Sequence, residues 1–332
     1  MRIWKLSLII GWIGLALTPR ASAQGFEAVG TRALGMAGAF VAVADDGTAT
    51  YWNPAGLGTG AMFSLVVERQ SFELGPRNPD MPHELQEGSS VLFALGTPPL
   101  GATYYRLRST RLFSEMNAER ASTGRLVRAS TLVTQHTGMS LVQSLGDALI
   151  VGTTLKYVHG RAGISTQKLT GENGLAEAAK LSGRGTNTFD LDLGAMASFG
   201  KMRAGVVVRN VLEPTFKTFD MDVKIPLQRQ ARVGLAVMPT NRLTISGDVD
   251  VTRTRGLGQD ERHIAIGAEQ WLWTRRVGLR GGFRVNTVDD SRPVGSAGLS
   301  IGLTSILWVD GFIQRGERST DRAWGISGRV AF

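Results

Sequence analysis

The last ten residues constrain the fold more than any other segment, because two kinds of side chain alternate along them. In an extended strand, successive side chains point to opposite faces. One face carries the bulky apolar residues and one glycine: Trp324, Ile326, Gly328, Val330 and Phe332. The other face carries small residues and an arginine: Ala323, Gly325, Ser327, Arg329 and Ala331. A strand with one face suited to lipid and one to a wet lumen is typical of a membrane β-barrel.

The first residues predict export. Arg2 and Lys5 form a basic region, an apolar run covers residues 6–17, and Ala21-Ser22-Ala23 offers a small-x-small cleavage site. We therefore expect residues 1–23 to be a signal peptide. The alternative is an N-terminal membrane anchor, but the apolar run is too short for a spanning helix.

Composition argues against several classes of protein. The chain contains no cysteine, which excludes a disulfide framework, a thiolate metal site and a lipid-modified cysteine. The formal net charge of +9 falls to +6 without Arg2, Lys5 and Arg20. Because the arginines alternate with apolar residues along strands, they do not form a nucleic-acid-binding face. No later stretch approaches the roughly 18 apolar residues of a membrane helix, so a helical inner-membrane protein is not expected.

Beyond residue 60 the sequence predicts strands of period two, joined alternately by tight turns and longer polar linkers. The ranges are 61–70, 89–97, 101–109, 129–143, 148–159, 185–198, 202–211, 228–238, 242–253, 261–271, 276–287, 293–303, 306–315 and 322–332. An even number of strands suits a closed barrel with both termini on one side. The longer linkers are 71–88, 110–128, 160–184 and 212–227, and we expect them outside the cell, with the tight turns in the periplasm.

The alternation is clearest late in the chain. Within 276–286, one face carries Val277, Leu279, Gly281, Phe283 and Val285, and the other carries three arginines. A soluble β-sandwich would also alternate, with its apolar face as the core. The export signal and the terminal aromatic strand favour the barrel.

Residues 30–58 precede the predicted strands and read GTRALGMAGAFVAVADDGTATYWNPAGLG. Three pieces stand out: Gly35-Met36-Ala37-Gly38-Ala39, Ala44-Asp45-Asp46 and Asn53-Pro54-Ala55-Gly56-Leu57. The segment resembles the N-terminal region of the FadL-like superfamily of outer-membrane transporters for long-chain fatty acids and hydrophobic compounds. That superfamily includes the PorV/PorQ-like barrels associated with type IX secretion.

The resemblance implies an all-β fold: a 14-stranded antiparallel transmembrane β-barrel over 61–332, with residues 24–60 as an N-terminal hatch in the lumen. It places Asn53, Pro54 and Ala55 in that hatch. Pro54 fixes its own φ and lacks a donor, so it ends a regular element, and the Asn53 amide can satisfy turn backbone groups. Two interpretations remain open, a motif that anchors the hatch to the wall and a gate that moves with ligand.

Charged residues of both signs fall on the predicted inward faces. They are Asp190, Asp192, Arg203, Arg209, Arg232, Asp248, Asp250, Glu269, Arg280, Arg284, Asp310 and Arg329. Charges away from water are costly unless paired, so a structural network is one interpretation. The other is a functional role, either as a polar route or through an arginine, such as Arg280 or Arg284, that binds a carboxylate group.

The sequence offers little support for catalysis. Its histidines, at positions 83, 136, 159 and 263, have no metal-binding spacing. The one Gly-x-Ser-x-Gly match, at residues 298–302, lies within the predicted strand 293–303 and not at the strand-to-helix turn of a nucleophile elbow. We therefore expect no enzyme activity and no cofactor.

The leading hypothesis is passive uptake of hydrophobic, fatty-acid-like molecules through a hatch-gated lumen in a Gram-negative-type outer membrane. The alternative is a PorV/PorQ-like barrel that binds or assembles secreted or surface proteins. The linkers offer few apolar side chains for capture, mainly Leu112, Phe113 and Met116. Expected partners are the bilayer, the barrel-insertion machinery, which would recognise Phe332, and a hydrophobic ligand such as a lipid or detergent, or a secreted protein.

Overall fold

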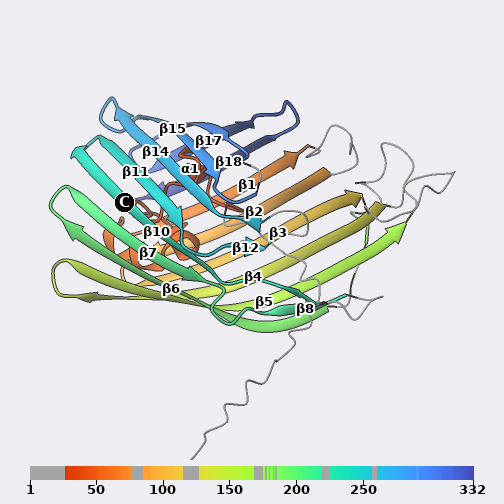
Figure 1. Cartoon of the computed structure of the whole chain (residues 1–332). Coiled ribbons are helices and arrows are strands. Elements are labelled where there is room, and N and C mark those ends of the chain that lie inside the picture. The colour runs from red at the N-terminus through yellow and green to blue at the C-terminus, as the bar shows by residue number, and fades with distance from the viewer. Residues whose placement is uncertain are drawn as a thin grey trace, which may run out of the picture.

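The computed structural model describes residues 27–75, 85–114, 127–167, 175, 178, 180–181, 183, 185–218, 224–255, 260–289 and 291–332. Within them, fourteen antiparallel strands form one closed barrel, in which β1 pairs with β18 (Figure 1). The 14-stranded barrel predicted from the sequence is therefore confirmed. The predicted signal peptide, residues 1–23, lies outside the described residues.

The first seven barrel strands are β1 (Ser64–Leu74), β2 (Leu85–Thr97), β3 (Leu100–Ser114), β4 (Val127–Leu145), β5 (Leu149–Gln167), β6 (Gly185–Phe199) and β7 (Met202–Arg209). The others are β10 (Gln230–Thr240), β11 (Leu243–Asp250), β14 (His263–Leu272), β15 (Val277–Asn286), β16 (Val294–Gly302), β17 (Leu307–Gly316) and β18 (Arg322–Ala331). Each of them overlaps one of the ranges predicted from the alternation. The C-terminus lies among the tight turns (Figure 1).

Several strands extend beyond their predicted ends. Strand β3 continues to Ser114 and β5 to Gln167, so parts of the predicted linkers 110–128 and 160–184 are strand. In these extensions, the contrast between an apolar outer face and a polar inner face is lost, because Thr110 and Arg161 lie at outward positions whereas Ala162 and Ile164 face inward and are buried. The pattern of a lipid-facing strand therefore ends although the ladder continues.

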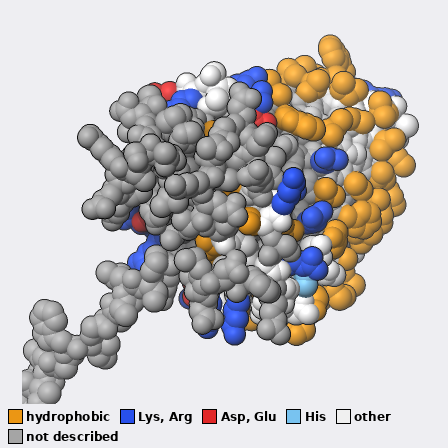
Figure 2. Space-filling view, turned by 90° about the vertical axis from the view of Figure 1, so that its right-hand side faces the viewer, with side chains coloured by type: hydrophobic (Ala, Val, Ile, Leu, Met, Phe, Trp, Pro, Cys, Tyr) orange, Lys and Arg blue, Asp and Glu red, His pale blue; other side chains and the backbone are white. Residues whose placement is uncertain are grey.

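The two faces of the wall differ as the alternation requires. On β18, the side chains of Trp324 and Ile326 are about half exposed, whereas those of Ser327 and Arg329 face inward and are buried. Apolar side chains cover the flank of the barrel that Figure 2 shows. The charged residues predicted on the inward faces lie there, and nine of the twelve are buried.

Residues 27–60, hereafter the inner segment, run inside the barrel (Figure 1). They form α1 (Thr31–Gly35), α2 (Ala49–Trp52) and the 3₁₀ helix η1 (Pro54–Thr59). Among the described residues, no helix has the length and apolar character needed to span a bilayer. The main hydrophobic core lies between this segment and the wall, where Tyr51 packs edge-to-face on Tyr105 with ring centroids 5.3 Å apart.

Two short hairpins supplement the barrel. One pairs β8 (Thr215–Lys217) with β9 (Lys224–Pro226), and the other pairs β12 (Thr254–Arg255) with β13 (Asp260–Glu261). Phe216 of β8 is fully buried in a second apolar cluster and lies where a side chain at Gly160 would be. The β8–β9 hairpin thus packs against the wall near β4 and β5, and the predicted linker 212–227 contains it.

Candidate functional site

A cavity of about 220 Å³ lies at the end of the barrel away from the tight turns. Its walls come from the ends of β1, β2, β3 and β15 to β18 that lie far from those turns, and part of the inner segment closes it. The apolar side chains that line it are Ala28, Leu34, Phe72, Leu74, Leu85, Leu107, Leu112, Val294, Phe312 and Ala323. A concave, mostly apolar site with a few polar groups is the usual form of a small-molecule site.

Charged side chains also line this cavity, and Arg284 is one of them. Its Nη1 lies 3.7 Å from Glu27 Oε1, and Arg111 and Arg292 line the cavity as well. The site therefore combines an apolar wall with guanidinium groups able to meet an anion. The ligand-binding role of Arg284 stays a prediction.

Hydrogen bonds from the barrel wall fix the floor of the cavity, which is part of the inner segment. Gln314 Nε2 donates to the carbonyl of Leu34 at 2.9 Å, and Ser296 donates to the same carbonyl. Gln70 donates to the carbonyl of Ala28. The backbone that a ligand would touch is thus tied to three different strands.

Glu27 forms a second tie beside the cavity. Its Oε1 lies 2.6 Å from Arg232 Nη2, and Arg232 Nε also contacts Asp250 Oδ1 at 2.6 Å. Burial alone raises the pKa of a carboxylic acid, but the charges of Arg232 and Arg284 outweigh it and hold the pKa of Glu27 well below its usual range. Glu27 is therefore an anion held against the wall by cations.

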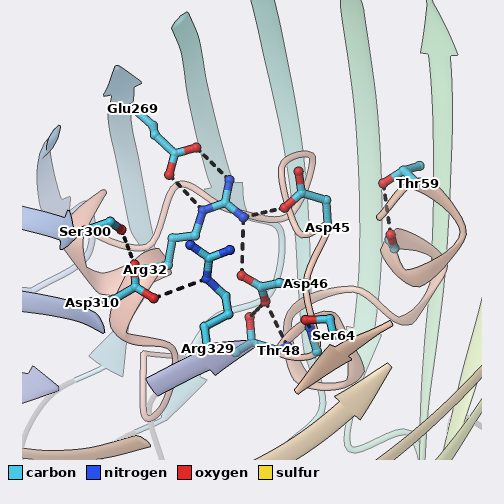
Figure 3. A network of polar contacts seen from close by, with 12 residues as sticks. Arg32, Asp45, Asp46, Thr48, Thr59, Ser64, Glu269, Ser300, Asp310 and Arg329 are labelled. Atoms are coloured by element: carbon cyan, nitrogen blue, oxygen red, sulfur yellow. Dashed lines mark hydrogen bonds and ion pairs between the residues drawn. The ribbon is translucent and has the colours of Figure 1, made fainter. Parts of the chain in front are cut away.

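The centre of the inner segment is held by Arg32 (Figure 3). Its guanidinium binds both carboxylate oxygens of Glu269, with Nε–Oε1 at 2.8 Å and Nη2–Oε2 at 2.6 Å. Nη1 contacts Asp45 and also lies 3.3 Å from Asp46 Oδ2. This bidentate geometry is the strong form of an arginine–carboxylate contact, so one side chain of α1 joins two parts of the inner segment to β14.

Arg280, the other predicted ligand-binding arginine, belongs to this network. Its Nε lies 2.7 Å from Glu269 Oε1, and its Nη2 lies 3.4 Å from Asp310 Oδ1. Asp310 also contacts Arg329 Nε at 3.2 Å (Figure 3). The side chain of Arg280 is fully buried and does not line the cavity. Its position favours the bracing role, and its ligand-binding role stays a prediction.

Two wall carboxylates accept hydrogen bonds from the backbone of the inner segment. Glu68 accepts from the N–H groups of Gly30 and Thr31 at 2.6 and 2.7 Å, at the start of α1. Asp248 Oδ2 accepts from those of Phe40 and Val41, both at 2.9 Å. These acceptors satisfy backbone donors that would otherwise be buried without partners.

Close contacts with two glycines of the barrel wall, Gly152 and Gly194, hold Asn53, Pro54 and Ala55. Asn53 Nδ2 donates to the carbonyls of Val41 and Ala195 at 3.0 and 3.1 Å, and its Oδ1 accepts from Ala55 N at 3.2 Å. A Cβ at Gly194 would lie 2.2 Å from Asn53 Oδ1 and 2.8 Å from Pro54 Cδ. Asn53 thus ties the inner segment to itself and to β6, a contact that favours the anchoring interpretation.

Arg32, Glu68 and Lys156 are buried charged residues that the sequence analysis did not single out. Lys156 Nζ contacts Asp192 Oδ1 at 2.6 Å and Asp190 Oδ2 at 2.8 Å. Lys156 and Glu68 lie on inward positions of their strands, so the alternation could have identified both. Arg32 had no such signal, because α1 is only five residues long.

Phe332 lies at the tight-turn end of the barrel, and its side chain is 64% exposed. Its ring stacks on Phe63, with centroids 5.1 Å apart, and the two residues exchange backbone hydrogen bonds of 3.1 Å. The role of Phe332 in assembly stays a prediction. No group of three or more His, Asp or Glu side chains suited to a metal ion occurs in the part of the chain that the structure describes.

Solved structures share this architecture. The monoaromatic hydrocarbon channel CymD matches 93% of this chain and 99% of its own, with a TM-score of 0.66 at 13% identity. The chain has the FadL-like barrel fold. The Ralstonia pickettii toluene transporter TbuX matches 92% of this chain and 99% of its own, with a TM-score of 0.61 at 16% identity. A Pseudomonas aeruginosa FadL homologue matches 92% of this chain and 98% of its own, with a TM-score of 0.61 at 10% identity.

The resemblance predicted from residues 30–58 is thus confirmed at the level of the FadL-like fold, and two of these neighbours, CymD and TbuX, are a channel and a transporter. The sequence also matches the family described as "F plasmid transfer operon, TraF, protein" over residues 107–250, less than half of the chain. No curated protein matches the sequence.

Proposed function

We propose that this protein is an outer-membrane channel for the passive uptake of small hydrophobic molecules, with no enzymatic activity and with the inner segment as its hatch. The observation that carries the proposal is the cavity beside Leu34, Leu107 and Phe312. An engineered apolar cavity of about 150 Å³ binds benzene, so the 220 Å³ of this cavity suffices for a one-ring hydrocarbon. CymD is described as a monoaromatic hydrocarbon channel and TbuX as a toluene transporter, and both support a one-ring hydrocarbon as the ligand class.

The inner segment suits a hatch because it is held differently along its length. Asn53 and Pro54 lie against Gly194, where backbone and wall are in close contact. Ala28 and Leu34, in contrast, line the cavity, where their carbonyls accept hydrogen bonds from wall side chains. We infer that residues 53–55 anchor the hatch and that the part nearer residue 27 moves when a ligand enters.

The outer surface supports placement in a bilayer. Large apolar side chains on the outward positions of many strands are 40–60% exposed, among them Tyr104, Leu193, Leu235, Phe283 and Ile326. A band of this kind with an inward polar face is the pattern of a transmembrane barrel. The linkers would then face the outside of the cell and the tight turns the periplasm.

The test is uptake of radiolabelled toluene by bacterial cells with matched amounts of assembled barrel. Ala323→Phe places a ring in the cavity, and Ala297→Phe places the same ring on the exposed outward face of β16. We expect wild-type and Ala297→Phe cells to take up toluene alike and Ala323→Phe cells several-fold more slowly.

Equal uptake by wild-type cells and cells without the barrel would contradict the channel. That outcome would favour the PorV/PorQ-like alternative, in which the barrel binds a secreted or surface protein. Equal uptake by both phenylalanine variants would show that the route avoids this cavity.

A further inference from the structure

A second hollow, about 300 Å³ in volume, lies on the outer face of the barrel wall over β3, β4 and β5. Five of its eight lining residues are basic side chains, namely Arg106, Arg108, His159, Arg161 and Lys180. The other three are Val133, Gln135 and Leu181, and none of the eight is acidic. Figure 2 shows Lys and Arg side chains gathered along the edge of the apolar outer surface.

The strand register explains why these side chains meet. Arg106 of β3 lies opposite Gln135 of β4, which lies opposite His159 of β5. In the next outward row, Arg108 lies opposite Val133, and Val133 opposite Arg161. Residues directly opposite on one face of an antiparallel pair have Cβ atoms about 5 Å apart. The ladder therefore holds the basic groups in one place.

The row next to the hollow, on its tight-turn side, is aromatic. Tyr104, Thr137, Tyr157 and Phe189 lie opposite one another in that order, and Tyr104, Tyr157 and Phe189 are 40, 43 and 60% exposed. Below them the outward positions are apolar, as at Leu155. Aromatic girdles mark the membrane–water interface of transmembrane barrels, so the hollow lies at headgroup level.

Arg106, Arg161 and Lys180 have no ion pair within the described residues. Among the described residues that line the hollow, no carboxylate offsets the repulsion between these three cations. A phosphate group carries the charge and the acceptor oxygens that such arginines bind. A basic cluster beside an apolar membrane surface attracts anionic lipid headgroups by about 1 kcal/mol per Lys or Arg.

We propose that this hollow binds the phosphate group of an acylated membrane lipid, with the acyl chains packed on the aromatic row and the apolar surface below it. The aromatic row favours a lipid over a soluble anion, because only a lipid has acyl chains that can contact this adjoining surface. The inference rests on the bilayer placement proposed above, but it does not depend on transport.

The test is native mass spectrometry of the full-length protein released from phosphatidylcholine nanodiscs doped with diphosphoryl lipid A. Arg106→Gln with Arg161→Gln removes two charges at the hollow and should weaken lipid A binding by roughly 25-fold, about fivefold for each cation. Arg242→Gln with Arg276→Gln makes the same change on exposed residues near the tight turns and should leave binding unchanged. Arg106→Lys with Arg161→Lys should retain most of the binding.

Two further binding measurements distinguish the phosphate group of a lipid from a soluble phosphate. Dephosphorylated lipid A should bind as weakly as diphosphoryl lipid A binds to the double glutamine variant. Soluble glucosamine 1-phosphate, which lacks acyl chains, should not compete at equal concentration.

Equal binding of lipid A by wild-type and Arg106→Gln/Arg161→Gln proteins, both shown to keep the folded barrel's heat resistance, would overturn the proposal. Full competition by glucosamine 1-phosphate would overturn the lipid assignment. Toluene uptake should not change in the glutamine variant, so a failed lipid test leaves the channel proposal untouched.

Discussion

The contact between Arg32 and Glu269 should determine how firmly the hatch is held. Arg32→Met introduces an apolar side chain of similar length. It leaves the carboxylates of Asp45, Asp46 and Glu269 without the guanidinium that they contact. Removing one partner of a buried ion pair costs about 3–5 kcal/mol. Glu269 keeps Arg280 at 2.7 Å, and the Asp45 side chain is 36% exposed, so water can solvate it. We therefore expect the lower value, about 3 kcal/mol, which raises the population of the released hatch roughly a hundredfold.

Hydrogen-exchange mass spectrometry on the detergent-solubilised protein measures this directly. Peptides from residues 30–58 should exchange about a hundredfold faster in Arg32→Met, while strand peptides keep their protection. The matched control is Arg322→Met, which breaks an exposed ion pair with Glu73, a type that contributes about 0–1 kcal/mol. Unchanged exchange over 30–58, or an equal increase in the strands, would refute an independently held hatch.

Three other predictions concern the anchor, the terminal residue and pH. Gly194→Ala should speed proteolysis of the hatch, because its Cβ would displace Asn53, whereas Gly247→Ala, whose Cβ would lie 3.7 Å from its nearest neighbour, should not; equal cleavage would show that Gly194 is not needed. Phe332→Ala should lower the amount of barrel assembled in the outer membrane without changing the heat resistance of the assembled fraction, and normal assembly would contradict this role. Because the pKa of Glu27 is lowered, its stabilising contact is complete above the usual carboxylate range and is lost only as pH falls below it. Glu27→Gln should therefore accelerate hatch exchange by the same factor, relative to the wild type at the same pH, at every pH between 5 and 8; a factor that falls towards one at pH 5 would contradict the assignment.

The barrel could be predicted because each strand lies between two different environments. On β15, Leu279 and Phe283 are about half exposed, while Arg280 is buried, and that contrast is visible in the sequence. The hairpin of β8 and β9 could not be predicted in this way, because three-residue strands are too short to show a period. Strand length was underestimated in β3 and β5, where the apolar outer face ends before the strand does.

The candidate site was only partly accessible from sequence. The position of Arg284 on an inward face was predictable, and the structure places it beside the cavity. Arg280 lies directly opposite Glu269 in the register of β14 and β15, and it reaches Asp310 on β17, two strands away. The contacts of Arg32 with β14 cannot be read from local pattern, since they join residues 237 positions apart.

The central claim is that the cavity between the hatch and the wall binds a small hydrophobic molecule. The most direct measurement is a crystal structure of the wild-type protein soaked with bromobenzene, whose bromine gives an anomalous signal. The claim predicts a peak inside the cavity, in contact with Leu34, Leu107 or Phe312. Bromine peaks confined to the apolar outer surface, with none in the cavity, would contradict it.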